Sequence, residues 1–74
     1  MSNRYHNNVE FRFNGAQWYT VSHGILLYNH KGQWGVNWAG LGTKTPDEAV
    51  LYGQALIAAG EFAAELNRSP ANKD

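Results

Sequence analysis

The strongest constraint in this sequence is a helix that begins at Thr45. Thr45 is a favourable N-cap, and Glu48 can hydrogen-bond back to the Thr45 N–H, which completes a capping box. Pro46 stands at the first helical position, where a missing N–H donor has no cost. Asp47 and Glu48 place negative charge at the positive end of the helix dipole. These signals agree and predict one long C-terminal helix.

The predicted helix spans residues 46–66 and ends at Asn67, because asparagine readily adopts the left-handed conformation that closes a helix. At about 3.6 residues per turn, its broad apolar face contains Leu51, Tyr52, Ala55, Leu56, Ala59, Phe62, Ala63 and Leu66. The polar strip is narrow for a helix with one side in water, and it consists of Asp47, Gln54, Glu61 and Glu65.

A third face of the helix carries small residues, flanked by Val50 and Ile57. Each glycine inside a helix costs about 1 kcal/mol relative to alanine, so an offsetting gain is expected. The glycines are tolerated without a role, make room for a large ring of the chain's own sheet, or allow a second helix to approach closely. The last alternative predicts a homodimer whose interface contains Ala49, Gly53, Ile57, Gly60 and Ala64.

Length and composition limit the classes of protein that this chain can form. Its 74 residues allow one domain, residues 1–74, with polar and disordered tails expected at 1–8 and 68–74. A formal net charge of zero argues against a general nucleic-acid or membrane-surface binder. No apolar run reaches the ~20 residues of a membrane span, so we expect a cytoplasmic protein.

The first half of the chain reads as strands. Residues 9–13 alternate between apolar and charged side chains, which is typical of a half-buried strand. Asn14-Gly15 predicts a two-residue hairpin turn that pairs Phe13 with Ala16 and Phe11 with Trp18. In this hairpin the phenylalanines share one face with Trp18 and Thr20, and the opposite face carries Glu10, Arg12, Gln17 and Tyr19.

The course of the chain after residue 17 has three interpretations. A strand that continues straight places Trp18 on the same face as Leu26 and Tyr28. A bulge at Gly24 gives one long, bent strand that places Trp18 on the same face as Ile25 and Leu27, and this interpretation is preferred. A tight turn there instead gives two strands. Further on, a second hairpin about Lys31 and Gly32 pairs Leu27 with Val36, Ile25 with Trp38 and Asn29 with Trp34, and the last strand spans residues 33–39.

These elements predict an α+β fold: an antiparallel three-stranded meander, or a four-stranded one with the tight turn, followed by one long C-terminal helix in a two-layer sandwich. Three or four strands are about 15–19 Å wide, whereas a helix is about 10 Å across. One helix is therefore not expected to cover the sheet, and the mismatch is a second reason to predict a homodimer.

No motif in the sequence predicts catalysis, a cofactor or a metal. The loop at residues 40–45 lacks the spacing of a phosphate-binding loop. The three histidines show no ligand spacing, and no cysteine supports them. Ser22 and His23 are adjacent and point to opposite faces of a strand. Glu61 and Glu65 are interpreted as a solvated pair. A pocket of ~300 Å³ or more is not expected in so thin a sandwich. An enzyme is therefore not predicted.

One surface remains as a candidate for binding a partner. The sheet face away from the helix is expected to carry Arg12, Tyr19, Tyr28 and His23. Arginine and tyrosine are enriched in protein interfaces, and they also stack on nucleotide bases. Zero net charge favours a protein over a nucleic acid, while an ordinary polar sheet surface is the simplest interpretation.

Part of the chain resembles a known group of proteins. The block at residues 36–49, Val-Asn-Trp-Ala-Gly-Leu-Gly-Thr-Lys-Thr-Pro-Asp-Glu-Ala, leads into an alanine-rich helix, and Trp-Tyr-Thr-Val-Ser stands upstream at 18–22. Together they resemble small uncharacterised proteins encoded by phages of actinobacteria, in which this strand–loop–helix recurs. The resemblance covers about half of the chain and carries no catalytic residues. It implies a phage gene product that acts inside a bacterial host by binding a host protein.

Overall fold

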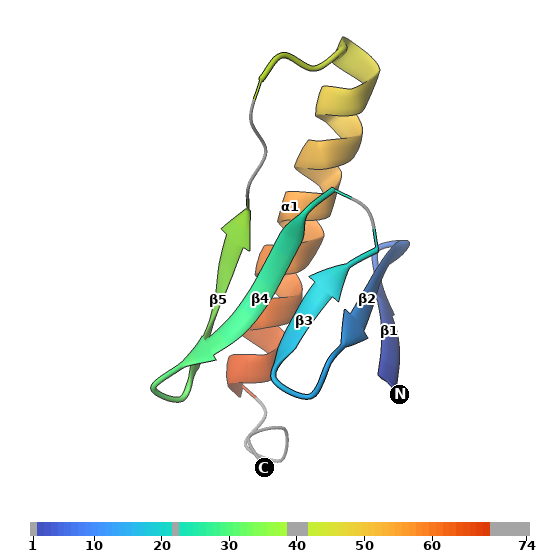
Figure 1. Ribbon diagram of the computed structural model, residues 1–74. Helices are drawn as coiled ribbons and strands as arrows, with labels where there is room; N and C mark the ends of the chain where they lie inside the picture. Colours follow the sequence, from blue (N-terminus) through green and yellow to red (C-terminus); the bar gives the residue numbers. More distant parts are fainter. Residues whose placement is uncertain (1, 22, 39–41, 69–74) are drawn as a thin grey trace.

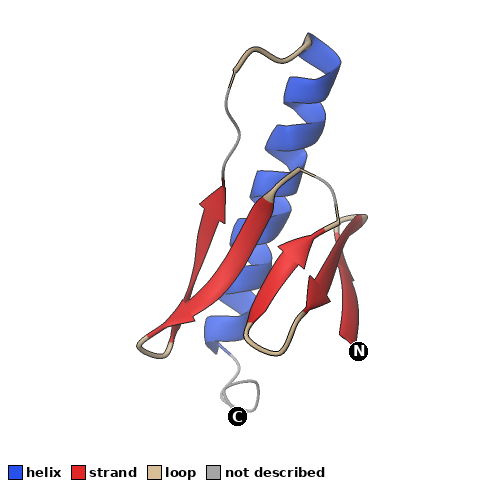
Figure 2. Ribbon diagram, viewed as in Figure 1, coloured by secondary structure: helices blue, strands red, loops and turns tan. Residues whose placement is uncertain are grey.

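The computed structural model describes residues 2–21, 23–38 and 42–68, which form five strands followed by one helix (Figure 1). Their bounds are β1 (Ser2–His6), β2 (Val9–Phe13), β3 (Gln17–Thr20), β4 (Ile25–His30), β5 (Gln33–Trp38) and α1 (Pro46–Arg68). The strands form one antiparallel sheet in chain order, and Figure 2 shows the helix as the second layer. The predicted α+β class is confirmed, but the sheet has five strands instead of three or four.

The additional strand, β1, lies where the sequence predicts a disordered tail over residues 1–8. That prediction is wrong, because β1 pairs with β2 along its whole length, from Ser2 opposite Phe13 to His6 opposite Val9. Asn7 and Asn8 connect the two strands with φ angles of 51° and 67°. Asparagine tolerates this left-handed conformation, which a two-residue hairpin turn requires at both positions. At the other end the helix continues to Arg68, and residues 69–74 lie outside the described part.

The hairpin between β2 and β3 has the predicted faces but a different register. Phe13 lies opposite Trp18 and Phe11 opposite Thr20, so the predicted pairs with Ala16 and Trp18 are wrong. The loop is longer because the Asn14 side-chain oxygen accepts hydrogen bonds from the N–H groups of Ala16 and Gln17 at 3.0 and 2.7 Å. The partner of each residue moves by two positions, and a shift of two keeps every side chain on its face.

The alternatives for residues 17–30 are resolved in favour of a turn. β3 and β4 are separate antiparallel strands, so the preferred bent strand is wrong. Trp18, Ile25 and Leu27 are nevertheless all buried, because Trp18 lies directly opposite Leu27. The second hairpin is confirmed in register, with Leu27 opposite Val36. Its turn residues Lys31 and Gly32 have φ angles of 54° and 86°. Residue 39, predicted to end the last strand, lies outside the described residues.

The core lies between the sheet and the C-terminal two thirds of α1. Phe62 is 1% exposed, and its ring centre lies 5.0 Å from the ring centres of both Phe11 and Trp18. The buried helix residues are Ala55, Ala58, Ala59, Phe62, Ala63 and Leu66. The small alanines let α1 approach the sheet closely, so that the large rings of β2 and β3 fill the space around Phe62.

The sheet curves around the helix. A flat five-stranded sheet would measure about 19 Å between its edge strands, about twice the helix diameter. Yet α1 contacts both edge strands, β1 and β5, as well as β4. On the β1 side, the Arg4 guanidinium lies 5.1 Å from the centre of the Phe62 ring and 3.5 Å from the Glu65 carboxylate. One helix therefore reaches both edges of the sheet, but it does not cover the end of β5, where Trp38, opposite the buried Ile25, is 55% exposed.

The start of α1 has the predicted capping box. The Glu48 N–H donates to Thr45 Oγ1 at 3.2 Å, and the Thr45 N–H donates to Glu48 Oε1 at 3.0 Å. Hydrogen bonding of the Glu48 carboxylate to the Thr45 N–H, and then to the Thr45 side chain, lowers the pKa of Glu48. A lowered carboxyl pKa stabilises the folded state fully above the ordinary value of about 4.3, and this stabilisation is lost as the pH falls through the folded-state pKa.

Replacing the capping threonine tests this start signal. We expect Thr45→Ala to lower the free energy of unfolding by about 1 kcal/mol, because the hydroxyl acceptor for the Glu48 N–H is lost. Urea denaturation monitored by circular dichroism at pH 7 measures the change. Thr43→Ala, an exposed position two residues before the cap, is the control. Equal unfolding midpoints for the two variants would contradict a stabilising cap.

Asn67 has a role different from the predicted one. It does not end the helix but lies within its last turn, and its side-chain amide binds the backbone of β5. The Trp34 N–H donates to Asn67 Oδ1 at 2.7 Å, and Asn67 Nδ2 donates to the Trp34 carbonyl at 3.2 Å. β5 is an edge strand, and edge strands carry outward backbone groups that invite pairing with other chains. Asn67 thus covers one residue of this edge.

A pair of variants tests the two hydrogen bonds of Asn67. We expect Asn67→Leu to lower the free energy of unfolding by about 1–3 kcal/mol and to raise light scattering, because both Trp34 backbone groups lose their partner. Asn67→Asp keeps the acceptor for the Trp34 N–H but sets a second carboxylate oxygen against the Trp34 carbonyl, so it should be destabilised as well. Urea denaturation and static light scattering give the two readouts. Wild-type behaviour of Asn67→Leu would contradict this role.

Candidate protein-binding surfaces

The face of α1 that points away from the sheet is apolar. All five residues of the predicted helix–helix interface lie there: Ala49, Gly53, Ile57, Gly60 and Ala64 are exposed, except that Gly53 is half-buried. Ile57 is 61% exposed, and Val50 beside it is 58% exposed. A Cβ atom built at Gly53 or Gly60 meets nothing within 4 Å, apart from the helix's own neighbouring backbone. The glycines therefore do not make room for a ring of the chain's own sheet.

The N-terminal part of α1 extends past the sheet, as Figure 1 shows. The helix has 23 residues, about 35 Å in length, whereas strands of four to six residues measure at most about 20 Å. Leu51 belongs to the predicted apolar face but is 56% exposed, and burial begins only at Ala55. The exposure of Leu51 departs from the prediction because the sheet ends before it. Leu51 therefore leaves apolar surface exposed on the sheet-facing side of α1, beyond the end of the sheet.

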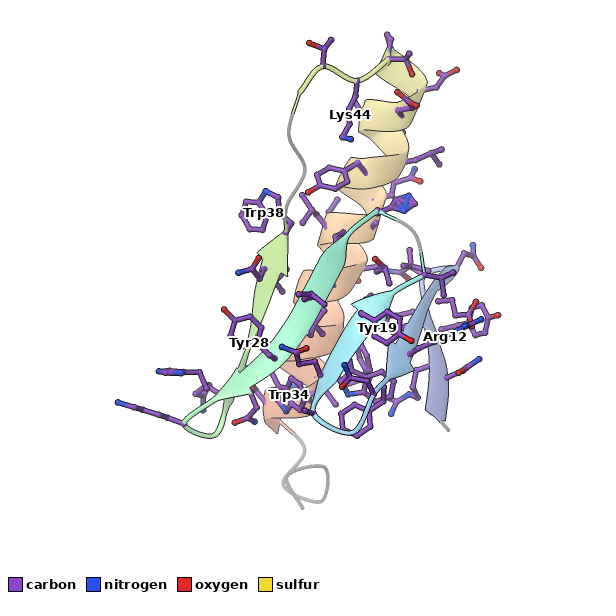
Figure 3. All side chains as sticks on the ribbon, viewed as in Figure 1. Arg12, Tyr19, Tyr28, Trp34, Trp38 and Lys44 are labelled. Carbon is purple, nitrogen blue, oxygen red and sulfur yellow. The ribbon has the colours of Figure 1, made fainter. Side chains whose placement is uncertain are left out.

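Three of the four predicted partner-binding residues share the outer face of the sheet. Arg12 lies directly opposite Tyr19 in the ladder between β2 and β3, and Tyr28 follows on β4 (Figure 3). The Glu10 carboxylate lies 3.1 Å from Arg12 Nε, and this hydrogen bond and the charge of Glu10 raise the pKa of Arg12. Glu10 thus neutralises the arginine that the face would offer to a phosphate.

His23, the fourth predicted residue, lies elsewhere, so its placement on the outer sheet face is wrong. It lies in the bend between β3 and β4 with a φ angle of 85°. Its ring stacks on that of Tyr52, with 6.5 Å between the ring centres and 13° between the planes. Tyr52 belongs to α1, so His23 is on the helix side of the molecule. The turn between β3 and β4, which the preferred interpretation lacked, places it there.

The acidic pair of α1 has a structural role that the sequence did not reveal. Glu61 Oε1 accepts a hydrogen bond from Asn7 at 2.6 Å and lies 3.0 Å from His6 Nε2, and Glu65 pairs with Arg4. Both carboxylates are about half exposed, as expected of a solvated pair, but the expectation that they lack partners is wrong, because they bind side chains of β1 and its turn. The sequence analysis could not predict these contacts with the helix, because it did not predict residues 2–6 as a strand.

The structure also bears on small-molecule binding. A surface hollow of about 470 Å³ lies where the turn after β1 and the end of β3 meet α1, with Asn7, Thr20 and Gln54 among its lining residues. The expectation that the fold has no room for such a volume is wrong. Within residues 2–21, 23–38 and 42–68, no group of three or more His, Cys, Asp or Glu side chains could hold a metal ion.

Comparison of the chain with models of protein families, with curated proteins and with solved structures returns no match. Across its described residues, α1 included, no helix combines the length and the hydropathy that a membrane crossing requires. The case for a function consequently depends on the surfaces described above.

Proposed function

We propose that this chain is a non-enzymatic accessory protein that acts by binding other proteins, and that it assembles as a homodimer through the outward face of α1. The observation that carries the proposal is the exposure of Val50 and Ile57, at 58% and 61%, beside two glycines with open space around them. Burying a side chain of this size contributes about 1.5–3 kcal/mol. A helix with both an inward and an outward apolar face requires a second partner surface.

The partner in this proposal is a bacterial host protein, which follows from the resemblance to phage-encoded proteins. The surface assigned to it is the outer sheet face with Arg12, Tyr19 and Tyr28, because this face stays open when the helix faces pair. Tyrosine and arginine supply rigid, amphipathic contact area. The neutralised Arg12 favours a protein over a nucleic acid, since phosphate binding requires free positive charge.

Two measurements test the proposal. Sedimentation velocity at micromolar concentration is expected to give twice the mass of one 8.3 kDa chain, and a clean monomer would reject the homodimer. For the partner, tagged protein is incubated with actinobacterial lysate, with the double variant Tyr19→Ala/Tyr28→Ala as the matched control. A protein retained by the wild type and lost by the control is expected. Equal retention would reject the assignment of the outer sheet face.

A gel-shift series separates this proposal from the nucleic-acid alternative. Single-stranded DNA and RNA are titrated with the protein at low and moderate salt, and no retardation is expected. Retardation that weakens steeply with salt, and that Arg12→Ala reduces, would instead favour a nucleic-acid-binding module on the sheet face.

A further inference from the structure

The outward face of α1 has the spacing of a helix–helix interface. Val50, Gly53, Ile57, Gly60 and Ala64 follow one another at intervals of three, four, three and four residues. This is the alternation that keeps one stripe of a helix against a partner helix over several turns. The stripe runs along the side opposite the buried residues of α1, and the curved sheet leaves it open.

The sizes of these residues distinguish the two directions in which a second helix could pack. In a parallel pair each residue faces its own copy, so Ile57 would meet Ile57 and both glycines would meet glycines. The pair of isoleucines would hold the two helices apart, and the glycine pairs one turn before and after would then leave voids between them. In an antiparallel pair Ile57 faces Gly60, and Gly53 faces Ala64, of the second copy. A large residue then meets a small one, so the distance between the two helix axes stays the same along the interface.

The charged margin of the stripe gives an independent argument. Asp47, Gln54, Glu61 and Arg68 recur every seven residues along one side of it. Antiparallel packing brings this margin against the same margin in reverse order. Asp47 then lies beside Arg68 of the second copy, and Gln54 beside Glu61, so that opposite charges and hydrogen-bonding groups match. A parallel pair would set Gln54 and Glu61 against the margin of Ala49 and Leu56, which is apolar.

We propose that α1 pairs antiparallel with α1 of a second copy, with the two-fold axis passing between Ile57 and Gly60. The inference rests on the homodimer of the proposed function and adds its direction. Asp47 and Arg68, both exposed, form an ion pair at each end of the interface. The two sheets lie on opposite sides of the helix pair, so each dimer presents two outer faces with Arg12 and Tyr19 pointing away from each other.

Single cysteines test the direction, because the chain has no cysteine of its own. Val50→Cys and Ala64→Cys are prepared separately, one of them with a mass tag, then unfolded and refolded together. In the antiparallel pair residue 50 is about 5 Å along the axis from residue 64 of the second copy, whereas the two copies of residue 50 are about 25 Å apart. A short bis-maleimide should therefore link the mixture and neither variant alone.

The outcomes separate the direction from the dimer itself. Sedimentation velocity is run on each variant and on the mixture before the reagent is added. A dimer in which Val50→Cys links to itself is a parallel pair, which overturns this inference and keeps the homodimer. A dimer in which no combination links uses another surface, which also overturns it. A monomer in all samples, including the wild type, rejects the homodimer and the direction with it.

Discussion

Ile57→Asp is expected to convert the proposed homodimer to a folded monomer. Each dimer loses two buried isoleucine side chains, about 3–6 kcal/mol of association free energy, and gains two carboxylates that would have to be buried. At 1.4 kcal/mol per tenfold change, the dissociation constant should rise more than about 100-fold. Sedimentation velocity across a concentration series measures this shift. The monomer should stay folded, because Ile57 is 61% exposed in a single copy.

The matched control for Ile57→Asp makes the same kind of change on another part of the surface. Tyr28 is 37% exposed and lies on the outer face of the sheet, the face turned away from α1. Tyr28→Asp should leave the dissociation constant unchanged. Surface substitutions of this kind change the free energy of unfolding by about 0.5 kcal/mol or less. Loss of the dimer in both variants would contradict an interface at Ile57. An Ile57→Asp monomer that is unfolded, instead of folded, would contradict it as well.

Phe62→Ala is expected to destabilise the protein strongly. The side chain is 1% exposed and contacts the rings of Phe11, Trp18 and His6, so its removal opens a cavity at the centre of the core. Such changes cost about 3–5 kcal/mol. A domain of 74 residues has a total stability of about 4–11 kcal/mol, so at least about a quarter of it would be lost. Urea denaturation followed by tryptophan fluorescence measures the change.

Leu51→Ala provides the comparison for Phe62→Ala on the same helix. Leu51 belongs to the apolar face predicted from the sequence, but it is 56% exposed because the sheet ends before it. Its truncation should change the free energy of unfolding by about 0.5 kcal/mol or less. If the two variants were equally destabilised, the N-terminal part of α1 would be packed as closely as the core, contrary to the structure.

Local signals were sufficient for several parts of the fold. The capping box at Thr45 and Glu48 forms as predicted, because both bonds join residues three positions apart. The hairpin at Lys31 and Gly32 has the predicted register, since a two-residue turn leaves few ways to pair its strands. The faces of β2 and β3 were predicted correctly even where the register was wrong, because alternation of side chains does not depend on the partner.

Other parts depended on contacts between distant residues. β1 lacks the apolar alternation of a strand. It pairs with the edge that β2 offers, and Glu61 and Glu65 of α1 bind its side chains. The Asn7-Asn8 pair before Val9 was the one local signal for its turn. The small residues on the outward stripe of the helix could be identified from the sequence alone. The misplacement of His23 followed directly from the missed turn between β3 and β4.

The sequence by itself determined the start of α1, the alternation of the strands and the presence of small residues on one helical stripe. Only the tertiary structure decided which apolar residues are covered. The sheet curves until both of its edges contact α1, and so one copy shelters Phe11, Trp18 and Phe62. The physical reason is that curvature and strand length are properties of the assembled sheet. They leave Leu51 exposed beyond the end of the sheet, whereas Val50 and Ile57 are exposed because they lie on the side of α1 opposite its buried residues.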